Sequence, residues 1–261
     1  MQKIALQGIL FDEKSSYLRG PALAPPLIRK AYHNTSANYF SENGMEILPE
    51  LWDDKGDFEI KDYFNIEKIT LKNLESNKPL ITLGGDHSIT YQLLKANYQK
   101  YGKVDILHID AHADLYDNFN GDKYSHACPF ARIMEDGLAN RLVQIGIRTL
   151  SKHQSNQAEK FKVEIIQMKD FDTNKLPKFK NPIYLSIDID GIDPAFAPGV
   201  SHHEPGGLST REVLKIIQNI NVPIIGADIV EYNPTKDIND ITAMVSAKLL
   251  KETAAKMLEN M

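Results

Sequence analysis

Short apolar runs alternate along this chain with amphipathic stretches, and this alternation limits the possible folds more than any other feature. Several runs are apolar throughout, which is typical of strands covered on both faces. The alternation predicts an α/β protein, a three-layer α/β/α sandwich with a mostly parallel sheet. We expect strands at 4–10, 79–83, 104–109, 142–147, 163–168, 183–189 and 223–230, and helices at about 22–32, 62–76, 88–100, 126–136, 153–161, 209–219 and 238–259.

The chain has 261 residues, a length at which an α/β protein is often one domain. Since no repeat or convincing linker divides it, we expect a single domain over residues 1–261. Residues 41–60 have the least regular pattern and are expected to form a surface excursion.

Composition narrows the possible partners and compartments. The formal net charge of −5 argues against a nucleic-acid partner, which would need a basic stripe, and suits a cationic small molecule. The one cysteine, Cys128, cannot form an internal disulfide, and it is expected to be a small buried side chain. No signal peptide is recognisable, and no apolar run is long enough to cross a membrane. We therefore expect a cytoplasmic protein.

Potential metal ligands follow three of the expected strands. The runs are Gly84-Gly85-Asp86-His87, Asp110-Ala111-His112-Ala113-Asp114 and Asp188-Ile189-Asp190. In a parallel α/β sheet, ligands bind beyond the carboxyl ends of the strands, where all three runs fall. Glu231 follows a fourth expected strand. Because residues two apart on a strand share a face, Asp110, His112 and Asp114 are expected to converge, and so are Asp188 and Asp190.

A cluster with four carboxylates and one or two imidazoles needs cations, because like charges at short range raise each other's pKa. Oxygen and imidazole ligands suit Mn²⁺, Fe²⁺, Co²⁺ or Zn²⁺, and the many carboxylates favour Mn²⁺. Six ligands are too many for one tetrahedral zinc ion but fit two metals with bridging carboxylates. Such a pair holds a bridging water that ionises near neutral pH, which predicts a hydrolytic centre.

These runs resemble the signatures of the ureohydrolase (arginase/agmatinase) family, and the resemblance extends from about residue 8 to the C-terminus. It is strongest to plant-type arginases, which are themselves similar to agmatinases. The segments that carry it are 84–88, 110–114 and 186–194, together with 18–21, 123–127, 130–135 and 197–208.

The resemblance implies two Mn²⁺ ions per chain and hydrolysis of a guanidino group to urea and an amine. It places one metal on His87, Asp110, Asp114 and Asp188, and the other on His112, Asp110, Asp188 and Asp190. Asp114 would also orient the attacking hydroxide, Glu231 would pair with the guanidinium, and His126 would be a mobile proton shuttle. It also implies a homo-oligomer, either a trimer or a hexamer.

The expected substrate is L-arginine or agmatine, which would give ornithine or putrescine beside urea. The residues that choose between them are expected in 115–125 and around 200–204, where His202 and His203 could contact the substrate or only solvent. The alternatives are the same chemistry on guanidinobutyrate or formiminoglutamate, a non-catalytic metal-binding homologue, and a one-metal deacetylase of similar topology.

Two further residues near the ligand runs have simpler interpretations. Asp86 is expected to orient a ligand histidine rather than bind metal. His108 is expected to be a hydrogen-bonded core residue that points to the face opposite Asp110.

Overall fold

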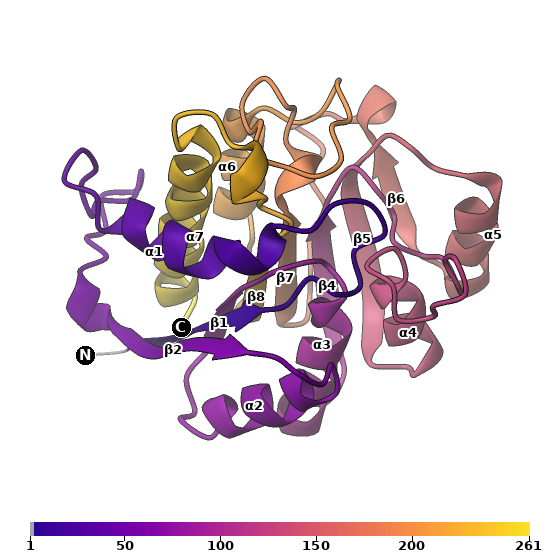
Figure 1. Ribbon diagram of the computed structural model, residues 1–261, viewed down its shortest axis with the longest axis horizontal. Helices are drawn as coiled ribbons and strands as arrows, with labels where there is room; N and C mark the ends of the chain where they lie inside the picture. Colours follow the sequence, from indigo (N-terminus) through magenta and orange to yellow (C-terminus); the bar gives the residue numbers. More distant parts are fainter. Residues whose placement is uncertain (1–2) are drawn as a thin grey trace.

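The computed structural model describes residues 3–261, which form an eight-stranded sheet between two layers of helices (Figure 1). Neighbouring strands all pair in parallel, in the order β2-β1-β3-β8-β7-β4-β5-β6. The predicted α/β/α sandwich is therefore confirmed. The strands are β1 (Ile4–Leu10), β2 (Trp52–Glu59), β3 (Leu80–Leu83), β4 (Val104–Ile109), β5 (Ala139–Ile147), β6 (Glu164–Gln167), β7 (Ile183–Asp188) and β8 (Ile224–Val230).

The seven main helices divide between the two faces of the sheet (Figure 1). One face carries α1 (Ala24–Tyr32), α6 (Thr210–Gln218) and α7 (Ile241–Glu259), and the other carries α2 (Asn65–Leu74), α3 (Ile89–Tyr101), α4 (Pro129–Glu135) and α5 (Lys152–Phe161). Each layer encloses its own apolar core against the sheet. All seven predicted helices are confirmed, with ends that differ by at most three residues.

The central strands are buried along their whole length, as their continuous apolar sequences predict. Every residue of β4 and β7 is buried, because helices cover both of their faces. Both strands lie near the middle of the sheet, where a polar residue placed at the strand end is shielded from bulk solvent.

The prediction for residues 41–60 was wrong in its second half, which contains β2. This strand pairs with β1 at the edge of the sheet, and most of its side chains are partly or fully exposed. Its sequence, Trp-Asp-Asp-Lys-Gly-Asp-Phe-Glu, lacks the apolar run that marked the other strands. An edge strand tolerates charged residues because only part of its surface packs on the core.

The four adjacent strands β3, β8, β7 and β4 end at one rim of the sheet, and each is followed by polar residues of interest. His87 follows β3, Glu231 follows β8, Asp188 ends β7, and Asp110 follows β4. Within residues 3–261, no helix is both long and apolar enough to cross a bilayer.

Candidate metal centre

The turn after β3 places His87 in the interior. Gly85 packs closely on Phe11, the residue that follows β1. A Cβ atom added to Gly85 would lie 1.7 Å from the carbonyl oxygen of Phe11. The carbonyl of Gly85 accepts a hydrogen bond from the backbone N–H of Glu231 at 2.9 Å. The ends of β3 and β8 are thus joined, and His87 is completely buried.

The hydrogen bonds of His87 define which ring nitrogen carries the proton. Its Nε2 lies 3.0 Å from the Oγ of Ser186, and that hydroxyl donates to the carboxylate of Asp228 at 2.6 Å. Ser186 must therefore accept from Nε2–H, so that the Nδ1 of a neutral His87 ring has no proton.

The bare Nδ1 faces three carboxylates. It lies 3.1 Å from one oxygen each of Asp110, Asp114 and Asp188, and among the described residues it has no well-formed hydrogen bond. Ligand atoms at adjacent octahedral positions, with bonds of about 2.1–2.2 Å, lie about 3.0–3.1 Å apart. A buried lone pair surrounded by anionic oxygens at this spacing fits a divalent cation.

A second group of donors lies beside the first and shares Asp110 with it. The Oδ2 of Asp110 faces His87, whereas its Oδ1 lies 3.5 Å from the Nδ1 of His112. That nitrogen is also 3.2 Å from the Oδ2 of Asp190. Asp110, His112 and Asp190 have the proximity expected of metal ligands, and Asp110 belongs to both groups of donors.

The convergence of Asp110, His112 and Asp114 has a different cause from the one predicted. The strand β4 ends at Ile109, so these residues lie in a loop and not on alternating strand positions. The loop folds back because the N–H of His112 donates to the carboxylate of Asp110 at 2.6 Å. Asp114 adopts a left-handed backbone conformation with φ of 50°, which turns its side chain towards His87.

Asp188 and Asp190 are brought together by a tight turn rather than by an extended strand. Asp188 ends β7 and caps a 3-10 turn, and its Oδ1 accepts the N–H of Asp190 at 2.7 Å. Its other oxygen faces His87. The side chains of all six predicted ligands therefore lie together.

Without cations the cluster holds extra protons. Burial and then the Asp190 charge raise the pKa of Asp188 well above its usual range, and burial with the Asp110 charge raises the pKa of Asp114 to about 6. Burial lowers the pKa of His87, but the three carboxylates that face its Nδ1 outweigh burial and raise the value. Bound cations would replace these protons.

Two expectations about neighbouring residues were wrong in part. His108 lies on the same side as Asp110, as residues two apart on extended chain should, and its Nε2 donates to Asp110 at 2.8 Å. Its Nδ1 accepts from Gln144, so it orients a ligand and is a hydrogen-bonded core residue. Within residues 3–261, the Asp86 carboxylate has no hydrogen bond to a ligand histidine. That carboxylate accepts hydrogen bonds from Lys14, Ser15 and Ser88.

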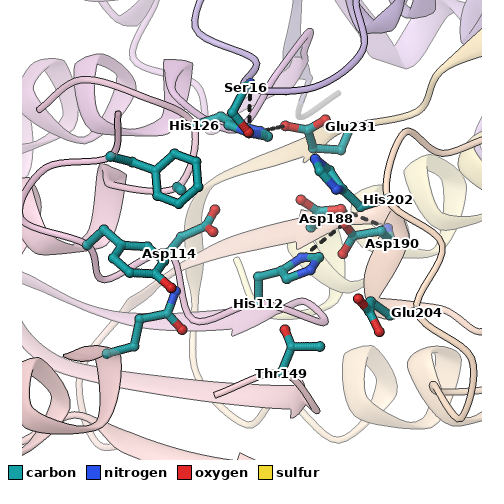
Figure 2. A pocket seen from close by; sticks show the side chains of 14 residues that line it. Ser16, His112, Asp114, His126, Thr149, Asp188, Asp190, His202, Glu204 and Glu231 are labelled. Atoms are coloured by element: carbon teal, nitrogen blue, oxygen red, sulfur yellow. Dashed lines mark hydrogen bonds and ion pairs between the residues drawn. The ribbon is translucent and has the colours of Figure 1, made fainter. Parts of the chain in front are cut away.

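His126 and Glu231 form a pair at one end of the pocket beside this cluster (Figure 2). The Nδ1 of His126 lies 2.9 Å from the Oε1 of Glu231, which also accepts the backbone N–H of His87. Burial lowers the pKa of His126, but Glu231 outweighs it and raises the value to about 9. Glu231 has a left-handed φ of 63°, and its Oε2 has no part in these contacts.

The pocket has a volume of about 280 Å³ and extends from His126 and Glu231 past His112 and Asp190 to Thr149 and Glu204 (Figure 2). The Arg148 guanidinium fixes its far wall by donating to the backbone carbonyls of Glu204 and Asp190, each at 2.7 Å. None of the residues lining it in the described chain is a lysine or arginine. The lining residues are Ser16, His112, Asp114, Tyr116, Phe119, His126, Ala127, Thr149, Gln154, Asp188, Asp190, His202, Glu204 and Glu231.

Sequence reasoning anticipated part of this lining. The segments expected to select substrate supply Tyr116, Phe119, His202 and Glu204, while His203 is exposed and contacts the carbonyl of Pro198. The contributions of Ser16, Thr149 and Gln154 were missed, because no motif distinguishes them. The role of Ser186 behind His87 could have been found, since it lies two residues before Asp188 on the same strand.

Comparison with known proteins agrees with this geometry. A family model described as the arginase family matches residues 2–255. The chain belongs to the arginase family. It is 46% identical to arginase 1, mitochondrial, of Arabidopsis thaliana, over 97% of this chain and 80% of that protein. It is thus an enzyme of the ureohydrolase class, from a metal-dependent family.

Solved structures support the same assignment. The arginase from Medicago truncatula has a TM-score of 0.92 and 43% identity, covering 98% of this chain and 87% of that one. The agmatine ureohydrolase of Thermoplasma volcanium has a TM-score of 0.87 and 33% identity, covering 99% and 90%. The fold is arginase-like, and similarity to both an arginase and an agmatine ureohydrolase leaves the substrate to be decided by the pocket.

Proposed function

We propose that this enzyme hydrolyses the guanidino group of L-arginine to urea and ornithine with two Mn²⁺ ions per chain. The observation that carries the proposal is the bare His87 nitrogen facing three carboxylate oxygens at 3.1 Å, beside a second donor group that shares Asp110. One metal would bind His87, Asp110, Asp114 and Asp188. The other would bind His112, Asp110, Asp188 and Asp190.

When bound, the two ions supply a water that ionises near neutral pH and so provide the attacking hydroxide. The protein's own groups position the substrate. Glu231 has Oε1 committed to two donors, which leaves Oε2 to accept hydrogen bonds from the planar guanidinium. Asp114 lines the same pocket as Glu231 and would orient the attacking hydroxide.

The departing nitrogen needs a proton when its bond to carbon breaks, and His126 is placed to give one. Its Nδ1 points at the carboxylate that would hold the guanidinium, so the same nitrogen faces the bound substrate. We propose that His126 is the general acid.

The far end of the pocket supports arginine as the substrate. Glu204 offers a carboxylate to the α-ammonium group, while Thr149 and Gln154 offer a hydroxyl and an amide to the α-carboxylate. Guanidinobutyrate and formiminoglutamate carry acidic tails and no ammonium group at this end, and the lining has no lysine or arginine to balance such a tail. Agmatine, which has an amine but no carboxylate, is the alternative substrate.

Urea release from arginine, agmatine and guanidinobutyrate, measured side by side with added Mn²⁺, tests the choice. We expect kcat/KM for arginine to exceed that for agmatine by more than about tenfold, a difference of about 1.4 kcal/mol. In Glu204→Gln, KM for arginine should rise about tenfold, while guanidinobutyrate, which lacks the amine and carries an acidic tail, serves as the control and should show no rise in KM. A preference for agmatine would contradict the assignment to arginine.

Three properties of the whole protein belong to the proposal as well. We propose that residues 1–261 form one domain and that the protein is a trimer or hexamer, as the family resemblance implies. We also propose a cytoplasmic location, for which the single buried Cys128 is compatible with a reducing compartment. The Arabidopsis relative is named as mitochondrial, so localisation of a tagged protein would decide between the two compartments.

A further inference from the structure

The loop between β1 and α1 reaches across the pocket and holds His126 from the side opposite Glu231. Both the backbone N–H and the Oγ of Ser16 lie within hydrogen-bond distance of the His126 Nε2, at 3.1 and 2.8 Å. The backbone N–H of His126 in turn donates to the carbonyl of Lys14 at 3.2 Å. Figure 2 shows Ser16 beside His126 at the end of the pocket.

This loop is fixed by polar contacts at several points. The buried carboxylate of Asp86 accepts the N–H of Lys14 at 3.0 Å, and the Lys14 ammonium pairs with Asp122 at 2.7 Å. Asp12 accepts the backbone N–H groups of Gly20 and Ala22 at the other end of the loop. Ser16 is therefore held against His126 by contacts that do not depend on the histidine.

The two ring nitrogens of His126 have different surroundings. Nδ1 faces Glu231 in the interior, whereas Nε2 faces Ser16, which is exposed at the pocket wall. Because the Ser16 N–H donates to Nε2, the neutral ring carries its proton on Nδ1. The Ser16 hydroxyl can donate to a bare Nε2 or accept from a protonated one, so it matches both states of the ring.

We propose that Ser16 is a positioning residue for His126 and connects its Nε2 to water in the pocket as a proton relay. This inference rests on the proposed role of His126 in guanidino hydrolysis. The proposal adds Ser16 to the residues that support catalysis. Ser16 lies in the loop between β1 and α1 and has no role as a metal ligand or substrate contact in the proposed function.

The proton balance of the relay closes over one turnover. The Ser16 hydroxyl proton passes to Nε2 while Oγ takes a proton from a water or buffer acid in the pocket. The Nδ1 proton passes to the departing nitrogen as its bond to the guanidino carbon breaks, which leaves the ring protonated on Nε2. The ring returns to its first form when Nδ1 takes the proton lost by the next attacking water and Nε2 returns its proton through Ser16.

Kinetics of Ser16→Ala, Ser16→Thr and Ser16→Val test the relay. We expect Ser16→Ala to keep its metal and a KM within about twofold of the wild-type value while kcat falls about tenfold. Ser16→Thr keeps the hydroxyl and should recover most of kcat, whereas its near-isostere Ser16→Val should not. Added imidazole should raise kcat of Ser16→Ala but not of the wild type, because an external acid replaces the relay. A wild-type kcat in Ser16→Ala, or equal loss in the Thr and Val variants, would overturn the proposal.

A second measurement does not depend on turnover. Above pH 9, where the ring is neutral, nitrogen-15 NMR of His126 should show Nδ1 protonated and the Nε2 signal shifted in Ser16→Ala, with no shift in Glu13→Ala, an exposed position in the same loop. An unchanged Nε2 signal in Ser16→Ala would refute the contact. If the wild type releases no urea from any guanidino compound, the proposed function fails, and the NMR result still decides whether Ser16 binds His126.

Discussion

At the scale of single residues, His87 and His126 have opposite environments that suit opposite tasks. The Nδ1 of His87 faces three carboxylates deep in the interior, and its other nitrogen is held by Ser186. This arrangement fits a ligand that does not move. His126 instead lines the pocket and is held between Glu231 and Ser16, so that a proton can enter or leave at either ring nitrogen.

Replacement of His126 tests proton transfer separately from metal binding. We expect His126→Ala to bind as much metal as the wild type, since none of the metal donors is lost. Its kcat should fall by at least about 100-fold, because the general acid is missing. Metal analysis of the purified variant together with urea assays checks both parts. Activity near that of the wild type would show that His126 does not protonate the leaving group.

At the scale of residues, the sequence predicted which ligand side chains lie together but did not predict several residues that line the pocket. The type and order of the ligands in three short runs were enough to predict all six side chains that lie together. Thr149, Gln154 and Ser16 could not be predicted, because none of them follows a metal-ligand run: Thr149 and Ser16 lie in loops, and Gln154 lies in the first turn of α5. The position of such a side chain depends on tertiary contacts and not on a local pattern.

At the scale of the elements, the rim depends on close backbone contacts between neighbouring strands. Gly85 links β3 to both neighbours, since it packs against the carbonyl of Phe11 after β1 and accepts from Glu231 after β8. The buried strands were predictable from their apolar runs. The edge strand β2 was not, because its charged residues carry no signal that distinguishes it from a surface loop.

Gly85→Ala tests this backbone contact. The added Cβ would lie 1.7 Å from a backbone oxygen, so the chain must shift, and we expect unfolding free energy to fall by about 2–3 kcal/mol in urea denaturation. Metal affinity should fall as well, because His87 is two residues away. Gly44→Ala is the control: its φ of 85° is strained for alanine but the added atom meets nothing within 4 Å, so about 1 kcal/mol is expected. Equal effects of the two changes would contradict the role given to Gly85.

At the scale of the whole molecule, metal binding and folding are coupled through the protons that the cluster holds. Burial and the Asp110 charge raise the pKa of Asp114 to about 6, compared with a value near 4 in an unfolded chain. Without metal, this proton stabilises the folded state at low pH, and the stabilisation is lost as the pH rises through about 6. A cation must displace the proton, so it binds more weakly below that pH.

The stabilisation by Mn²⁺ should therefore depend on pH. We expect the rise in Tm that saturating Mn²⁺ causes to be small near pH 5 and to grow as the pH increases to about 7. Thermal unfolding with Mn²⁺ or with a chelator across this range measures it. A metal-induced rise in Tm that stays constant from pH 5 to 7 would show that no cluster proton is exchanged for metal.

The central claim is that two cations bind between His87, His112 and the four aspartates and that this pair supports urea release. Its most direct test is to add Mn²⁺ stepwise to metal-free protein while bound metal and urea production from arginine are measured together. We predict two ions per chain at saturation, with urea production rising as the pair fills, and only one ion in His112→Ala with most of the activity lost. Full urea production with one bound ion or none, or two bound ions without urea production from any guanidino compound, would contradict the account.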